Sequence, residues 1–339
     1  MIDLKGFIAQ MPKIELHLHI EGSFEPELMF KIAQRNNVVI PYKTVEEVKK
    51  AYNFNNLQEF LDIYYAGAGV LLTEQDFYDL TWAYLLKIHV ENVIHTEIFF
   101  DPQTHTERGV SFDAVIKGIH GALEDGKQQL GISYKLIMSF LRHLSEASAF
   151  KTLEQALPYS SWIDGVGLDS SEVGNPPSKF QKVYEIAHQA GFKAVAHAGE
   201  EGPAEYVWEA LDLLKIDRLD HGNRSLEDTN LVERLIADKI ALTICPLSNY
   251  KLKVVSDMQH HPLKVMLQKK LLATVNSDDP AYFGGYMSDN FWAVTEALQL
   301  SKEDLYQLNV NAVNGSFANV DEKAIMHQKI DAYFDKYID

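Results

Sequence analysis

The sequence predicts an α/β fold in which eight parallel strands and their helices form a (β/α)8 (TIM) barrel. Apolar runs of strand length alternate with amphipathic helical runs from end to end, a pattern typical of parallel strands joined by helical crossovers. Eight strand-like runs occur, and from the third on they recur about every 25 to 30 residues, close to the length of one strand–helix–strand unit. A doubly wound open sheet is the alternative arrangement of the same elements.

The first expected strand lies within residues 14–22 and carries two histidines. Side chains two residues apart in a strand point to the same face, so His17 and His19 project together while Leu16, Leu18 and Ile20 face the other way. Two neighbouring imidazoles can hold one metal ion, because neutral histidine is a common nitrogen ligand of zinc. A metal site of this kind requires further ligands from elsewhere in the chain.

The other elements are expected in regular order along the chain. The remaining strands are expected at residues 93–100, 132–140, 163–169, 193–197, 218–221, 241–245 and 272–276. Helices are expected at residues 26–35, 57–89, 112–130, 180–190, 204–214 and 231–239. The roughly 70 residues between the first two strands exceed a normal crossover, so we expect extra helices there that cover one barrel mouth. The tail, residues 302–339, is expected to be helical and to pack outside the barrel.

Composition restricts the class of function. The chain has 339 residues, 46% of them hydrophobic, and no linker or low-complexity segment, so we expect residues 1–339 to form a single catalytic barrel domain. A formal net charge of −17 argues against nucleic acid as a partner and suits a small-molecule substrate. No apolar run approaches the roughly 20 residues of a membrane span, and no secretory signal is expected. The only cysteine, Cys245, leaves no internal disulfide, as in cytoplasmic proteins.

Polar side chains stand where four of the expected strands end. The first strand supplies the two histidines, and the others end in the runs 197–200 (His-Ala-Gly-Glu), 220–222 (Asp-His-Gly) and 276–280 (Asn-Ser-Asp-Asp-Pro). The carboxyl ends of barrel strands converge on one mouth, which is where such barrels carry their active sites. Burying several ionisable groups together is costly unless a metal or mutual pairing offsets the cost. The pattern therefore predicts a metal site.

The residue types at these ends suit a catalytic metal. His17, His19, His197 and Asp278 leave one coordination position for water, whose pKa zinc lowers to about 7. Glu200 is then a candidate general acid, and His221 can orient or stabilise the attacking hydroxide. The fourth strand has no lysine at its tip to bridge two metals, which favours one ion. Zinc is expected, and iron or manganese also suits these ligands.

Five motifs together resemble the adenosine and adenine deaminase family of metal-dependent hydrolases. They are His17-Leu18-His19, His197-Ala198-Gly199-Glu200, Asp220-His221-Gly222, Cys245-Pro246-Leu247-Ser248-Asn249 and Asn276-Ser277-Asp278-Asp279-Pro280, in register across about residues 10 to 320. The resemblance implies a (β/α)8 barrel of the metal-dependent hydrolase type with one zinc ion. The other zinc deaminases use a pattern with two cysteines, which this chain cannot supply.

The resemblance also implies a role for each site residue. His17, His19, His197 and Asp278 bind zinc, and Glu200 donates a proton to N1 of the purine. His221 and Asp278 hold the hydroxide that attacks C6, ammonia leaves, and Asp279 hydrogen-bonds N7.

Two glutamates favour the adenine deaminase (type 2) branch of this family. The nucleoside-acting branch typically has aspartate at the position of Glu21 and glycine at that of Glu172. We expect the longer side chains to fill the ribose volume and to present a carboxylate to the N3 or N9 edge of a free base. The implied reaction converts adenine to hypoxanthine and ammonia in purine salvage. Adenosine and N6-substituted adenines are alternative substrates, and a non-catalytic purine- or metal-binding protein is the alternative outside enzymes.

Overall fold

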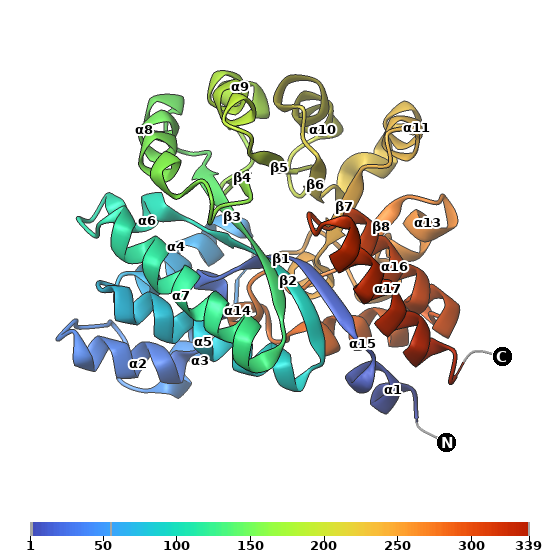
Figure 1. Cartoon of the computed structure of the whole chain (residues 1–339), viewed down its shortest axis with the longest axis horizontal. Coiled ribbons are helices and arrows are strands. Elements are labelled where there is room, and N and C mark those ends of the chain that lie inside the picture. The colour runs from blue at the N-terminus through green and yellow to red at the C-terminus, as the bar shows by residue number, and fades with distance from the viewer. Residues whose placement is uncertain (1–2, 55, 338–339) are drawn as a thin grey trace.

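Eight parallel strands pair in sequence order around a barrel, as predicted, and helices surround them (Figure 1). The computed structural model describes residues 3–54 and 56–337. The strands are β1 (Lys13–His19), β2 (Val93–Phe100), β3 (Ser133–Leu141), β4 (Gly165–Asp169), β5 (Lys193–Ala198), β6 (Arg218–His221), β7 (Ala241–Ile244) and β8 (Leu272–Val275). The order β1 to β8 without rearrangement excludes a doubly wound sheet, whose strand order reverses at a switch point.

The barrel closes between β8 and β1 beside the two histidines of the first strand. A parallel bridge joins Leu18 to Asp278. The amide of His19 donates to the carbonyl oxygen of Asp278 at 3.0 Å, and the amide of Asp278 donates to that of His17 at 3.1 Å. The two hydrogen bonds that close the barrel therefore also fix Asp278 between His17 and His19.

Helices lie outside the ring of strands and cover it on all sides seen in Figure 1. They are α1 (Leu4–Gln10), α2 (Pro26–Arg35), α3 (Val45–Ala51), α4 (Leu57–Ala68), α5 (Glu74–Val90), α6 (Pro102–Thr106), α7 (Phe112–Leu130), α8 (Glu146–Ala156), α9 (Gln181–Gln189), α10 (Ala204–Glu209), α11 (Thr229–Ala237), α12 (Pro246–Lys251), α13 (Leu263–Gln268), α14 (Pro280–Phe283), α15 (Met287–Leu298), α16 (Lys302–Gly315) and α17 (Val320–Phe334). Across the described ranges, none of these helices has the length and apolar character needed to cross a membrane.

The expectation of one long helix at residues 57–89 is wrong, because the chain forms two helices there. Gly69 caps the end of α4, and α5 begins at a capping box in which the side chains of Thr73 and Asp76 each accept a backbone N–H. The apolar periodicity continues across the break, so it hides the boundary. As a result, α5 packs against α7 while α4 is free to cover the barrel mouth, as expected for this insertion.

The C-terminal tail is helical, as predicted, within the described residues, and it forms two helices. The break lies at residues 316–319, where Asn319 and Glu322 make a capping box that starts α17. The first of the two helices, α16, packs against β8 and β1 and so covers the closing seam from outside. Residues 338 and 339 of the expected tail lie outside the described residues.

Candidate active site

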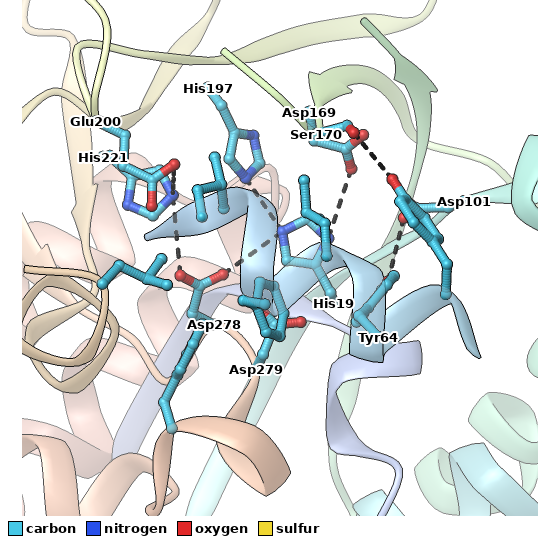
Figure 2. A pocket seen from close by; sticks show the side chains of 16 residues that line it. His19, Tyr64, Asp101, Asp169, Ser170, His197, Glu200, His221, Asp278 and Asp279 are labelled. Carbon is cyan, nitrogen blue, oxygen red and sulfur yellow. Dashed lines mark hydrogen bonds and ion pairs between the residues drawn. The ribbon is translucent and has the colours of Figure 1, made fainter. Parts of the chain in front are cut away.

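A cavity opens at the carboxyl ends of the strands, where the sequence predicts the site. Its empty space, including the open mouth, is about 390 Å³. One wall is the face of α4 that carries Leu57, Phe60 and Tyr64, and the floor is made by the predicted polar residues (Figure 2). These lining residues are His19, His197, Glu200, His221, Asp278 and Asp279.

Three imidazoles and one carboxylate converge at the base of this cavity. His19 Nε2 lies 3.1 Å from His197 Nε2, and His17 Nε2 lies 3.2 Å from Oδ1 of Asp278. His19 Nε2 is 3.6 Å from the same Oδ1. The Nε2 atom of His17 is buried and has no hydrogen-bond partner. Imidazole nitrogens and a carboxylate oxygen that face one another in this way form a group that could bind a metal ion.

His221 adjoins this group but faces a different atom. Its Nε2 lies 3.9 Å from Oδ2 of Asp278, whereas His17 and His19 face Oδ1. His17, His197, His221 and Asp278 also form a group whose candidate ligand atoms all lie within 4.8 Å of one another. Both His221 and Asp278 adopt positive φ angles, 61° and 64°, a rare conformation for side chains of this kind that concentrates at functional sites.

Carboxylates lie beside the Nδ1 atoms of the imidazoles and orient the rings. Asp220 lies with one oxygen 3.6 Å from His17 Nδ1 and the other 3.6 Å from His197 Nδ1. The hydroxyl of Thr243 donates to Asp220 at 3.0 Å and lies 2.8 Å from His17 Nδ1. Asp169 plays the same part for His19, with 3.5 Å between its Oδ2 and Nδ1. Such contacts leave the Nε2 atoms free for a metal.

Burial shifts the pKa values of the candidate acid and the candidate base of the site in opposite directions. Burial and the nearby Asp278 carboxylate raise the pKa of Glu200 well above its ordinary value. Burial lowers the pKa of His221 to about 4, although Asp278 opposes this shift. Burial and Asp278 likewise raise the pKa of Asp279 well above the ordinary range. These shifts favour the protonated forms of Glu200 and Asp279 and the neutral form of His221.

Asp278 itself stays ionised. Burial works against its charge, but the imidazoles of His17, His221 and His19 outweigh burial and lower its pKa. An ionised carboxylate among buried imidazoles is the state in which aspartate binds a metal.

The expectation that Glu21 and Glu172 present carboxylates to the substrate is wrong. Oε1 of Glu21 lies 2.8 Å from His105 Nε2 and accepts the amide of Asp101 at 3.3 Å, behind the cavity wall. The Glu172 carboxylate is occupied by backbone amides of the loop after β5. Glu21 lies in the short 3₁₀ turn Glu21–Ser23, and Glu172 lies in the loop after β4. Both side chains point toward these buried partners and away from the cavity, so neither lines it.

Sequence reasoning missed several polar residues of the site. Asp101, Asp169 and Tyr64 line the cavity, and the hydroxyl of Tyr64 donates to Asp101 at 3.1 Å. Burial, then the neighbouring Glu21, raises the pKa of Asp101 to about 7. Asp101 and Asp169 stand at the ends of β2 and β4, so the rule that selected the other strand tips also points to them.

Comparisons with known proteins agree with this geometry. The family model described as adenosine deaminase matches residues 12–333. The adenine deaminase of Acinetobacter baylyi is 65% identical over 316 residues, 93% of this chain and 95% of its own. That of Hahella chejuensis is 59% identical and covers 98% of this chain and 100% of its own.

Solved structures of an adenine deaminase and of an amidohydrolase share the fold of this chain. The crystal structure of adenine deaminase from Arthrobacter aurescens superposes with a TM-score of 0.94 at 48% identity, covering 96% of this chain and 99% of its own. An amidohydrolase from Burkholderia ambifaria with bound Zn superposes with a TM-score of 0.90 at 27% identity, covering 99% and 95%. The chain therefore belongs to the adenosine deaminase family and is a hydrolytic deaminase.

Proposed function

We propose that this protein is an adenine deaminase that converts adenine and water to hypoxanthine and ammonia. Relatives that are 58–65% identical over nearly the whole chain carry that name, as does the structural neighbour from Arthrobacter aurescens. We place the reaction in purine salvage in the cytoplasm, where the single buried Cys245 needs no oxidising environment.

We assign one zinc ion to His17, His19, His197 and Asp278. The donor set of three imidazoles and a carboxylate suits zinc, and the related amidohydrolase from Burkholderia ambifaria binds Zn. When bound, the metal supplies a water molecule activated for attack at neutral pH. His221 is left outside the ligand set because it faces the other oxygen of Asp278.

The remaining polar residues handle protons and hold the ring. Protonated Glu200 donates to N1 of adenine and makes C6 more electrophilic. Neutral His221, with its Nε2 3.7 Å from Glu200 Oε2, accepts a proton from the attacking water. Asp279 keeps its proton and donates it in a hydrogen bond to N7, which is an acceptor.

We assign the preference for the free base to Asp101 and Asp169. Figure 2 shows Glu200 and His221 on one side of His19, and Asp101 with Tyr64 on the other. A carboxyl oxygen can accept the N9–H of adenine, and adenosine lacks this hydrogen because its N9 carries ribose. Asp101→Ala should therefore lower kcat/KM for adenine more than for adenosine. An equal loss on both substrates would refute this assignment.

The observation that carries the proposal is the convergence of His17, His19, His197 and Asp278 beside an acid and a base. The test is an assay of metal-replete protein on adenine, in which ammonia and hypoxanthine should appear in equal amounts. Protein stripped by a chelator should be inactive and should recover when zinc is restored. Metal-replete protein that releases no ammonia from adenine would refute the proposal.

A further inference from the structure

Glu172 fills a nest of backbone amides with its carboxylate. Its Oε1 accepts the amide of Gly199 at 2.7 Å. Its Oε2 accepts the amides of Glu200 at 3.1 Å, Glu201 at 2.8 Å and Gly202 at 2.7 Å. Successive amides that point at one anion form a strong binding site, and hydrogen bonds to a charged acceptor are stronger than neutral ones. The loop after β4 thus holds four consecutive amides of the loop after β5.

The held loop is shaped around this carboxylate. A Cβ atom on Gly202 would lie 2.6 Å from Oε1 of Glu172, so any larger residue would displace the contact. Gly199 has a φ of 70°, which side chains rarely adopt, and this turn brings its amide to face Glu172. Both glycines flank Glu200. The backbone on either side of the general acid is therefore fixed by a single carboxylate.

A buried arginine, Arg142, interacts electrostatically with this carboxylate. Arg142 is fully buried, and burial lowers the pKa of its guanidinium, although the negative charge of Glu172 opposes this shift. Arg142 Nη1 donates to the carbonyl oxygen of His197 at 2.6 Å, and its Nε donates to that of Asn175 at 2.8 Å. Arg142 therefore ties the loop after β4 to the end of β5, while Glu172 ties the loop after β4 to the loop after β5.

We propose that Glu172 is a positioning residue that acts on catalysis through Glu200. Its carboxylate holds residues 199–202 in the conformation that directs the Glu200 carboxyl into the cavity. Both of its oxygens are engaged by amides, so it does not touch the purine. This inference rests on the proposed role of Glu200 as general acid, and it adds a residue that the family resemblance does not assign.

The first test compares two substitutions of Glu172 with a matched control, Glu201, on the loop that Glu172 holds. Glu172→Ala should lower kcat on the order of 10²-fold, because a misplaced catalytic group loses about this much, with KM changed less than about threefold. Bound zinc should stay at the wild-type level. Glu172→Gln keeps one accepting oxygen and should recover part of kcat. Glu201→Gln is the control: its carboxylate accepts the amide of Leu57 at 3.3 Å, and kcat should stay within about threefold of wild type.

The second test asks whether the effect passes through Glu200. In a Glu200→Gln background, Glu172→Ala should lower kcat by less than about twofold, because no acid remains to be positioned. A loss that multiplies with that of Glu200→Gln, an unchanged kcat in Glu172→Ala, or a loss of zinc in Glu172→Gln would overturn the inference. If Glu172→Ala does not fold, Glu172→Gln alone carries both comparisons. Wild-type protein inactive on adenine would instead refute the proposed function itself.

Discussion

Nε2 of His221 lies 3.7 Å from Oε2 of Glu200 at the base of the cavity. Burial lowers the pKa of His221 to about 4 and raises that of Glu200 well above its ordinary value. The two neighbouring groups are therefore shifted in opposite senses: burial favours the neutral imidazole of His221, which can accept a proton, and the protonated carboxyl of Glu200, which can donate one. Deamination needs both, because water loses a proton while the purine ring gains one.

The dependence of kcat/KM on pH should show the ionisation of both His221 and Glu200. A base works above its pKa, so kcat/KM should rise on the acid side as His221 loses its proton. An acid works below its pKa, so kcat/KM should fall on the alkaline side as Glu200 loses its proton. Both limbs can be measured from initial rates that give kcat/KM at each pH across the range in which the protein stays folded. A Glu200→Gln profile that keeps the same alkaline limb would show that Glu200 is not its source.

Glu200→Gln should lower kcat by about 10²- to 10⁴-fold, the usual contribution of a general acid. Glutamine has nearly the same shape, but it holds no carboxyl proton for N1. Zinc content measured on the same protein should equal that of wild type, because Glu200 is not a proposed ligand. The exposed Glu205 on α10 offers a matched control, and Glu205→Gln should retain full activity. A Glu200→Gln variant with activity close to wild type would contradict the proposed mechanism.

Metal content should separate the ligands from the base. His19→Ala removes a proposed ligand, so the purified protein should hold less zinc and lose activity together with it. His221→Ala should keep its zinc and still lose about 10²-fold or more in kcat, because only the base is gone. Equal loss of zinc in both variants would place His221 among the ligands, as its membership of the four-residue group allows.

Asp220→Asn should weaken zinc binding by about 10- to 100-fold, the usual effect of losing an orienting carboxylate. Asp220 lies against Nδ1 of both His17 and His197, and an amide holds two imidazoles in place less well than a carboxylate. Competition with a chelator of known affinity measures the change. The exposed Asp212→Asn serves as control and should bind zinc like wild type.

The strands and the site residues could largely be predicted because their signals are local. Alternation of side chains places His17 and His19 on one face, and the barrel rule brings the ends of β5, β6 and β8 to the same mouth. The split between α4 and α5 is signalled by Gly69 and Thr73, but an uninterrupted apolar period masks it.

The partners of Glu21 and Glu172 could not be predicted from the sequence. Glu172 meets amides about 30 residues later, and Glu21 meets His105, which lies 84 residues away. Such contacts depend on how adjacent strand–loop units pack in three dimensions, and one-dimensional periodicity carries no information about them. The presence of glutamate at positions 21 and 172, where the nucleoside-acting branch typically has aspartate and glycine, indicates that these positions differ. It does not indicate which residues the glutamate side chains contact.

This deaminase is expected to act on the free base, adenine, in preference to the nucleoside. The most direct test of this preference is to measure kcat/KM for adenine and for adenosine side by side on the same metal-replete preparation, following ammonia release. We expect a higher value for adenine, with hypoxanthine as the product. A higher kcat/KM for adenosine would contradict it.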